Sequence, residues 1–500
     1  MNLPVVIKKI FFFLADTAIA VGAIAQVTIY PVTAALKPSD DYKVFVNDKE
    51  AFVYASPVPA AYCSFEISAP VNITIKANRD IKWVDVRPLS SGIRPVFKDS
   101  TIQFRIAKPQ QLSIELNGSI KLPLFIFANA PEINKPSKND ANVIFFETGK
   151  IHNAGLIEIK SNQTVYIEAG AVVIGAITAK DATNIKIRGC GIMDGTWNNR
   201  FDDSLIKAGL YDKLPQPSHD TYRRFIELIN CEDVTIEGIT LHNNTTWQLV
   251  PEGCRKVAIY DIKIISDQPS DDGIDVVHCK DLHISNCFIR TKDDCVVVKA
   301  YSKAPHTKEV DNVVVENCVF WNALWGNALE IGFELNGVDV KNIRFRNCDI
   351  IHVEAGAVLS IHNAGTSHVS NVIFENIRIE DARQKLFDVA IFRSQYSDDG
   401  TDDPEEKKRI YLNGAWDGVL TVPGDKKEYH AQFRGFVKNI VFRNIQIVDG
   451  PFPFSLFYGF NQTHAIEHVM IENLRVHGKK ILSLKEAKIY MENAKNITIR

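Results

Sequence analysis

The sequence has no excess of charge of either sign. Its 57 lysine and arginine residues nearly balance 60 aspartate and glutamate residues, which gives a formal net charge of -3. Binding to nucleic acid or to an anionic membrane depends on clustered positive charge, so we expect neither partner. Beyond the N-terminal segment no stretch reaches the ~18 uncharged apolar residues of a transmembrane helix, so no membrane span is expected once that segment is removed.

The sequence also lacks paired cysteine motifs. None of its nine cysteines belongs to a CxxC pair, so a zinc site is not expected. The odd number leaves at least one thiol free, and one or two disulfides are possible in an exported protein. Cys287, Cys318 and Cys348 occupy the same place in three successive repeats, which favours a buried ladder of small side chains over chemistry.

The N-terminal segment has the pattern of a secretory signal. Lys8 and Lys9 precede an apolar run, and the run ends in AIA, a small-x-small cleavage site, before Gln26. This pattern predicts a signal peptide over residues 1–25 and a secreted or periplasmic protein. An uncleaved membrane anchor is the alternative.

Short apolar runs fill residues 26–135. Runs such as YKVFVND, CSFEIS and VNITIKA alternate with polar turns at even spacing, which indicates a small β-sandwich. The polar segment APEINKPSKNDAN follows, and its two prolines predict a linker.

From residue 141 to residue 500 one pattern recurs, with instances such as NIKIRGCGI, NVVVENCVF and NIVFRNIQI. Most neighbouring instances lie 23 to 31 residues apart, and strand-rich repeats of this length stack as coils. The expected fold is therefore all-β: a right-handed parallel β-helix preceded by the N-terminal β-sandwich. Asparagine tolerates left-handed backbone, which suits the recurring bends. The stretch between Ile379 and Asn439 is longer than a coil needs and predicts a projecting loop.

Two pairs of adjacent aspartates, Asp271-Asp272 and Asp293-Asp294, lie about one repeat apart. Residues one coil apart in a β-helix stack at the strand spacing of about 4.8 Å, so Asp272, Asp293 and Asp294 should share one patch. Carboxylates this close cannot all ionise freely, and at least one should hold a proton near neutral pH. A protonated acid beside an ionised base is what glycosidic bond cleavage requires.

Two other interpretations of these aspartates remain. Paired aspartates in turns often only accept backbone N–H bonds. Alternatively, Asp267, Asp271, Asp272 and Asp275 could supply oxygen ligands to calcium, although their spacing is not that of an EF-hand loop.

The segments SDDGIDV and KDDCVVVK resemble the NTDGID and GDDC motifs of glycoside hydrolase family 28, the polygalacturonases and related pectinases. Upstream, GCGIMDGTW resembles the GxGxIDGxG stretch of that family. The resemblance implies an inverting glycoside hydrolase that needs no metal and no cofactor. It implies Asp293 as the general acid, with Asp272 and Asp294 holding and activating the water.

The match breaks at two motifs. WGNALEIG stands where the family has GHG, so Asn327 replaces the histidine. GAVLSIHNAG stands where the family has RIK, so the arginine is missing and His362 is at best a substitute for the lysine. Without that cation pair the site lacks the charge-assisted bonds that favour an acidic sugar. A neutral sugar fits better, as in the related family 49 of dextranases and isopullulanases, which also has a sandwich before its β-helix.

The expected substrate is a polysaccharide, either of the pectin type or a neutral α-glucan, and the expected state is a monomer. Candidate substrate-binding residues are Trp247, Asn327, Glu330 and His362, with Trp325, Glu334, His352 and Glu354 as further cleft candidates. A tryptophan can equally serve core packing, whereas a glutamate within an apolar strand needs a partner. A polysaccharide lyase and a non-catalytic β-helix adhesin are the competing function classes.

Overall fold

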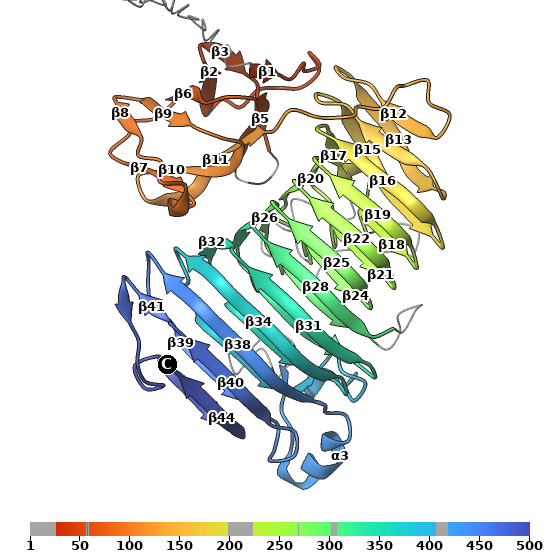
Figure 1. Cartoon of the computed structure of the whole chain (residues 1–500), viewed down its shortest axis with the longest axis vertical. Helices are drawn as coiled ribbons and strands as arrows, with labels where there is room; N and C mark the ends of the chain where they lie inside the picture. Colours follow the sequence, from red (N-terminus) through yellow and green to blue (C-terminus); the bar gives the residue numbers. More distant parts are fainter. Residues whose placement is uncertain are drawn as a thin grey trace, which may run out of the picture.

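The computed structural model describes residues 27–198, 224–301, 308–406 and 419–500, apart from positions 57, 59 and 269. The predicted signal peptide lies outside the described residues. Figure 1 shows a small β domain along one flank of a long stack of strands that continues to the C-terminus. Among the described residues, no helix combines the length and the apolarity needed to cross a membrane.

The N-terminal domain consists of two sheets that enclose one core. The first sheet contains β1 (Val27–Ile29), β4 (Val53–Ala55), β5 (Ala61–Ile67), β7 (Val84–Arg87), β10 (Gln110–Leu116) and β11 (Ser119–Asn129). The second contains β2 (Tyr42–Val46), β3 (Lys49–Ala51), β6 (Val71–Ala77), β8 (Val96–Lys98) and β9 (Thr101–Ile106). Alternate side chains such as Val44, Ile73, Phe65 and Ile114 fill the space between the sheets.

The second domain winds into coils whose parallel strands form three faces. Sheet 1 contains β18 (Ile226–Ile229), β21 (Leu249–Glu252), β24 (Ile274–Val277), β27 (Val296–Ala300), β30 (Leu329–Leu335), β33 (Ala357–Asn363), β35 (Lys385–Ile391), β39 (Phe454–Tyr458) and β43 (Ile489–Glu492). Sheet 2 contains β12 (Val143–Phe146), β14 (Thr164–Ile167), β16 (Thr183–Gly189), β19 (Glu232–Glu237), β22 (Arg255–Tyr260), β25 (Lys280–Ser285), β28 (Val310–Glu316), β31 (Asp339–Arg346), β34 (His368–Ile379), β38 (Phe436–Ile447), β40 (Ile466–Glu472) and β44 (Ala494–Ile499).

Sheet 3 contains β17 (Ile192–Asp194), β20 (Thr240–His242), β23 (Lys263–Ile265), β26 (Phe288–Thr291), β29 (Val319–Asn322) and β32 (Asp349–Val353). Near the start of the domain β13 (Ile151–Ile159) pairs with β15 (Val172–Lys180), and β15 pairs with both β17 and β18. Near its end β38 pairs with β41 (Arg475–Val476), which turns back on β42 (Lys479–Lys480). The all-β fold predicted from the repeats is confirmed.

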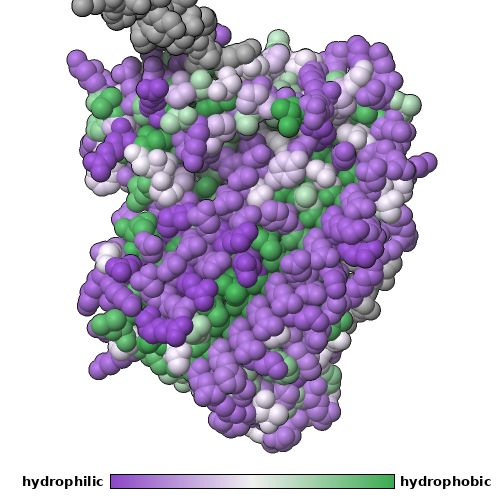
Figure 2. Space-filling view, viewed as in Figure 1, coloured by the Kyte–Doolittle hydropathy of each residue, from purple (hydrophilic) through white to green (hydrophobic). Residues whose placement is uncertain are grey.

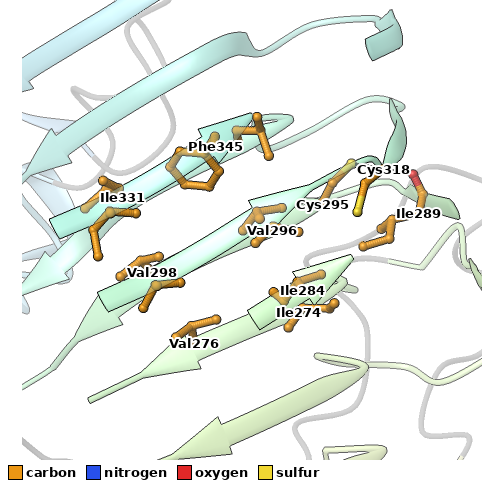
Figure 3. Close-up of a cluster of buried hydrophobic side chains, with 14 of the residues drawn as sticks. Ile274, Val276, Ile284, Ile289, Cys295, Val296, Val298, Cys318, Ile331 and Phe345 are labelled. Carbon is orange, nitrogen blue, oxygen red and sulfur yellow. Dashed lines mark hydrogen bonds between the residues drawn. The ribbon is translucent and has the colours of Figure 1, made fainter. Parts of the chain in front are cut away.

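Inward side chains hold each coil in register with the next. Ile274 pairs with Val296, Val276 pairs with Val298, and Val298 pairs with Ile331. All five are fully buried, and Figure 3 shows them in rows across adjacent strands. Burial of each such side chain contributes about 1.5–3 kcal/mol, and a slip by one residue would turn these rows outward. The rows therefore fix which outward residues lie above one another.

Asparagine ladders mark the bends, as the repeats predict. Asn312, Asn342 and Asn371 each have a φ of 58°, and Asn371 Nδ2 donates to Asn342 Oδ1 at 3.3 Å. In a second ladder Asn347 donates to Asn317 at 2.6 Å. Asparagine adopts the left-handed region at lower cost than most residues, and its amide bonds to the same position of the next coil.

The cysteine ladder is also confirmed. Cys287, Cys318 and Cys348 are fully buried, and the Cys287 backbone N–H donates to Cys318 Sγ at 3.3 Å. All nine cysteines lie within the described residues and all are free thiols. These side chains act as small core residues, and the possible disulfides are not formed.

The predicted loop between Ile379 and Asn439 is wrong in its first part. The run KLFDVAI forms β35 and continues sheet 1, because its inward side chains join the core of the coils. The excursion starts after Ile391 and contains β36 (Arg393–Ser394), β37 (Val419–Leu420), a 3-10 turn (Gly424–Lys426) and α3 (Lys427–Ala431). Arg434 Nη1 ties it to the coils by donating to the carbonyl oxygens of Ala364 and Phe392.

The sandwich packs against sheet 3. Phe125 contacts Phe288 with ring centroids 4.8 Å apart and meets Trp321 edge-on. His352, a cleft candidate from the sequence, lies instead in this interface, where its Nε2 is 2.9 Å from Glu115 of the sandwich. That assignment was wrong because the repeat pattern does not reveal which face the first domain covers.

A polar groove separates the sandwich from the turns that join sheets 2 and 3. Its volume is about 780 Å³, and its lining includes Gln111, Glu132, Arg188 and Asn286. Figure 2 shows a hollow where the two domains meet on the face in view. Gln111 bridges the groove by donating to the Asn286 carbonyl at 2.7 Å, and Arg188 Nε lies 2.6 Å from Glu237.

We expect Asn347→Ala to lower the free energy of unfolding by about 1–3 kcal/mol. Alanine would have to hold the φ of 51° without an amide, and the bond to Asn317 would be lost. Asn347→Gly keeps the backbone conformation and should lose less. Thermal melts monitored by circular dichroism compare the two variants, and equal losses would contradict a role for left-handed backbone.

Candidate active site

The predicted aspartates lie in two turns that lead from sheet 3 into sheet 1. Asp271 and Asp272 precede β24, and Asp293 and Asp294 precede β27. Because Ile274 pairs with Val296, Asp272 stacks on Asp294 of the next coil. The Gly273 N–H donates to the Asp294 carbonyl at 2.8 Å and fixes this alignment. The structure thus brings both pairs together at one corner of the helix.

The two members of the first pair have different environments. Asp271 Oδ1 accepts the backbone N–H groups of Lys292 and Asp293, both at 2.9 Å, and Oδ2 accepts that of Gln268 at 2.8 Å. Burial nevertheless raises the pKa of Asp271 to about 7. The turn-capping interpretation therefore describes Asp271, which holds the Asp293 backbone in place.

Asp272 and Asp275 share one buried cation. Lys299 Nζ lies 2.9 Å from Asp272 Oδ2 and 2.9 Å from Asp275 Oδ1. All three residues are at most 5% exposed. Burial lowers the pKa of Lys299, but the carboxylates around it, Asp272 first, raise it more, so the net pKa is well above the usual range. The amine stays charged and offsets part of the repulsion among the acids.

Asp293 and Asp294 are half-buried at the surface of the cluster. Burial raises the pKa of Asp293 well above its usual range, and the charges of Asp272 and Asp271 raise it further. Burial also raises the pKa of Asp294, with Glu330 the next contributor. Near neutral pH this corner therefore retains protons that isolated aspartates would lose.

The next coil supports the second pair. Gly326 has a φ of +66°, and a Cβ there would lie 2.4 Å from Asp294 N and 2.5 Å from Asp293 Oδ1. Asn327 donates to Asp294 Oδ1 from its backbone N–H at 2.6 Å and from Nδ2 at 3.3 Å, and its Oδ1 accepts the Ala357 N–H at 2.8 Å. Asn327 thus orients Asp294, and its predicted contact with substrate stays a prediction.

Glu330 and His362 form a buried chain behind Asp294. His362 Nδ1 is 2.9 Å from Glu330 Oε1, and His362 Nε2 is 3.1 Å from Asp388 Oδ2. Ser360 donates to the other oxygen of Glu330, and Lys385 Nζ is 2.5 Å from Asp388. Burial lowers the pKa of His362, but Glu330 and Asp388 raise it more, to about 9. Both side chains are at most 1% exposed, so their predicted contact with sugar stays untested.

Two tryptophans border the acids. Trp247 is half-buried, with Lys299 Nζ 3.8 Å and Arg224 Cζ 4.6 Å from its ring centroid. Trp325 is half-buried, with Lys292 Nζ 5.0 Å from its ring centroid. Both therefore keep exposed surface next to the aspartates, as sugar-stacking side chains require.

The calcium interpretation finds little support in these contacts. Asp267 pairs with Arg290 at 2.9 Å, while Asp271, Asp272 and Asp275 bond to backbone N–H groups or to Lys299. Among the described residues no group of three or more histidine, cysteine, aspartate or glutamate side chains is placed to hold a metal ion.

Several residues of the cluster were missed from the sequence. Lys299, Asp388 and Arg224 carry charges inside it. Asp275 was considered only as a calcium ligand and not as a partner of Lys299. The alternation in β24 and β27 was a usable signal, because Ile274, Val276, Val296 and Val298 face the core and so direct Asp275 and Lys299 outward.

Replacing Lys299 by methionine should lower the free energy of unfolding at pH 7 by about 3–5 kcal/mol, because the buried carboxyl groups of Asp272 and Asp275 would lose the cation that they share. The pKa of Asp275 is raised by burial, so the loss should shrink as the pH falls and that carboxyl is protonated. Asp275→Asn in the same variant should recover part of it. Urea unfolding at pH 7 and pH 5 measures these effects.

The matched control is Lys280→Met. Lys280 pairs with Glu309 and Asp311 at the surface, so its loss should cost under about 1 kcal/mol. A Lys299→Met variant as stable as this control would contradict the charge-balancing role.

Comparison with known proteins shows which family the chain resembles. Glycosyl hydrolases family 28 matches residues 132–400, which span both aspartate turns. A polygalacturonase from Juniperus ashei is 25% identical over 209 residues, which are 41% of this chain and 38% of that protein. The chain spans between 28% and 38% of the length of the first curated relatives it matches.

Two solved structures share the fold. Dex49A from Penicillium minioluteum aligns with a TM-score of 0.62 at 15% identity, over 94% of this chain and 96% of that chain. The family 28 exopolygalacturonase from Yersinia enterocolitica aligns with a TM-score of 0.51 at 12% identity, over 86% of this chain and 96% of that chain. At these identities the likeness shows the fold alone. The family match covers more than half of the 500 residues, and the chain belongs to glycosyl hydrolases family 28.

Proposed function

We propose that this protein is a secreted or periplasmic, monomeric glycoside hydrolase that cleaves a pectin-type polysaccharide with inversion. The observation that carries the proposal is the in-register stacking of Asp272 on Asp294, with Asp293 beside them and Lys299 bonded to Asp272. Family membership supports the reaction class, and the titration of the cluster supports the roles of the acids.

Asp293 is the proposed general acid. Its raised pKa keeps a proton on the carboxyl near neutral pH, and that proton passes to the glycosidic oxygen as the bond to the anomeric carbon breaks. Asp272 and Asp294 hold a water on the other face of the sugar, and one of them accepts its proton while the oxygen attacks. Protonated Asp293 and an ionised partner are restored by exchange with solvent, and inversion follows from this single displacement.

The sugar in the reactive subsite is proposed to be neutral. A uronate carboxylate would need an available cation for charge-assisted bonds. Lys299 already pairs with Asp272 and Asp275, and Arg224 pairs with Glu227 and Glu252. Pectin includes neutral sugars, and a neutral α-glucan is the alternative substrate. A panel of pectic, xylogalacturonan, rhamnogalacturonan and α-glucan polymers, scored by released reducing ends, identifies the polymer.

Asp293→Asn should lower kcat about 10²- to 10⁴-fold on the polymer that wild-type protein hydrolyses, because the amide cannot donate the acidic proton. KM should change little, because asparagine has nearly the same shape. Asp281→Asn makes the same chemical change at the asparagine ladder, away from the cluster, and should leave activity unchanged. Activity of Asp293→Asn equal to that of Asp281→Asn would remove Asp293 from the mechanism.

Hydrolysis is separated from elimination by the products. We expect new reducing ends without any unsaturated product that absorbs in the ultraviolet, as elimination from a uronate would give. An absorbing product from the wild-type protein would replace the hydrolase proposal by a lyase.

The raised pKa of Asp293 should affect the pH dependence of two quantities, the rate of hydrolysis and the stability of the fold. First, kcat/KM should fall as the pH rises through that pKa, because the acid ionises. Second, a carboxyl with a raised pKa in the folded state stabilises the fold below the unfolded pKa of about 4 and loses that contribution as the pH rises. Asp293→Asn should therefore melt at a higher temperature than wild type at pH 7, and the difference should vanish below about pH 4. A lower melting temperature at pH 7 would contradict the raised pKa.

A further inference from the structure

A second cavity lies between the sandwich and the first coils, apart from the aspartates. Its volume is about 350 Å³, and its lining includes Ser56 and Tyr62 from the sandwich and Asp194 and His242 from sheet 3. Asp194 pairs with His242 in adjacent strands of that sheet. The volume is at the lower end of the roughly 300–1,000 Å³ of small-molecule sites.

Four buried polar atoms of residues that line this cavity have no hydrogen bond in the described part of the chain. Among the described residues, Ser56 Oγ, Tyr62 Oη and both ring nitrogens of His242 lack a hydrogen-bond partner. Tyr62 is 1% exposed and His242 is 8% exposed. Buried hydroxyl and imidazole groups nearly always have a partner, because each one left without it costs free energy. Several such atoms around one cavity indicate groups that are satisfied by something bound there.

The chemistry of the lining selects the ligand. Burial lowers the pKa of His242, so the neutral ring offers one donor and one acceptor. Asp194 Oδ2 is 3.5 Å from His242 Nε2 and adds acceptor oxygens that would repel an anion. Lys37 at the rim is exposed. The apolar side chains of Leu36, Val172 and Ile192 also line the cavity. An uncharged ring with several hydroxyl groups and an apolar face fits this combination.

The cavity lies on the same corner of the helix as the aspartates. Asn243, which also lines it, starts the turn that continues to Trp247 and β21. The equivalent turns of the next two coils hold Asp272 and then Asp293. Two coils correspond to roughly 10 Å along the helix axis.

We propose that this cavity is a binding site for one neutral pyranose, a second sugar subsite built jointly by the sandwich and the β-helix. The subsite rests on the proposed function in that the sugar would be a unit or branch of the same polysaccharide. The sandwich then contributes directly to recognition: Tyr62 and Ser56 bond to hydroxyl groups on one side of the ring, and His242 and Asp194 bond on the other.

The test uses the full chain, with D-xylose, L-rhamnose, D-glucose, D-galactose and D-galacturonate as probes in saturation-transfer NMR. We expect at least one neutral sugar to bind, and D-galacturonate to bind more weakly. Tyr62→Phe should weaken that binding about 3- to 10-fold, the effect of one hydrogen bond, and His242→Leu should abolish it. Asp293→Asn should leave it unchanged, which separates this cavity from the reactive site.

The melting temperature of Tyr62→Phe shows whether weaker sugar binding comes from the lost hydroxyl or from a damaged fold. Because its hydroxyl has no partner in the described protein, the variant should melt at or above the wild-type temperature. Tyr42→Phe is the matched control: its hydroxyl donates to the Leu122 carbonyl at 2.7 Å, so it should lower stability and leave sugar binding intact. Binding that is absent for every probe, or that survives both Tyr62→Phe and His242→Leu, would overturn the proposal and leave water as the occupant.

Hydrolysis assays keep the two proposals separate. On a polymer that wild type cleaves, Tyr62→Phe should raise KM with kcat unchanged. If the wild-type protein hydrolyses no polymer of the panel but binds a sugar in a manner that depends on Tyr62, the enzymatic proposal is overturned and the subsite is supported. Hydrolysis with kcat and KM both unchanged in Tyr62→Phe and His242→Leu would overturn the subsite alone.

Discussion

The stacking of inward apolar rows is the constraint on which the candidate active site and the proposed second subsite both depend. Because Ile274, Val296 and Leu329 occupy one buried row, every outward position is fixed relative to the same position one coil away. Repulsion among Asp272, Asp293 and Asp294 opposes this arrangement, but it acts against the burial of a core that runs the length of the domain. Rigid coils can therefore hold carboxylates at separations that a flexible loop would relax.

The charges of the aspartate cluster are balanced by side chains in direct contact with them. Lys299 lies beneath Asp272 and Asp275, and Asn327 supplies two donors to Asp294. Behind them His362 sits between Glu330 and Asp388 with its pKa raised to about 9. Asp272 and Asp275 thus share a cation and Asp294 has two donors from Asn327, while Asp293 accepts the Asp294 N–H at 3.1 Å and lies beside acids that raise its pKa. In the proposed mechanism, this uneven distribution suits Asp293 to donate a proton and its neighbours to accept one.

The sequence predicted the parts of this arrangement that repeat. The β-helix, the asparagine bends, the cysteine ladder and the meeting of the aspartate pairs all follow from spacing and alternation. Other features depend on register or on contacts between domains, which spacing does not contain. In the sequence Lys299 looks like the ordinary end of an apolar strand. His352 looks like a cleft residue until Glu115 of the sandwich is placed beside it. KLFDVAI was predicted as part of a loop because charged residues flank it.

The contacts in the structure explain the two departures from the family motifs. Asn327 stands where a histidine is expected, and it orients Asp294 through two hydrogen bonds. His362 stands in the strand where cations are expected, and Glu330 and Asp388 use both of its nitrogens. The cavity at Tyr62 and His242 likewise has a carboxylate and neutral polar groups, with its one lysine exposed at the rim. At both places a uronate would meet buried carboxylates, whereas an uncharged ring would meet hydrogen-bonding groups. The proposal of a neutral sugar in the reactive subsite and the proposal of a neutral sugar in the second cavity therefore depend on the same physical argument.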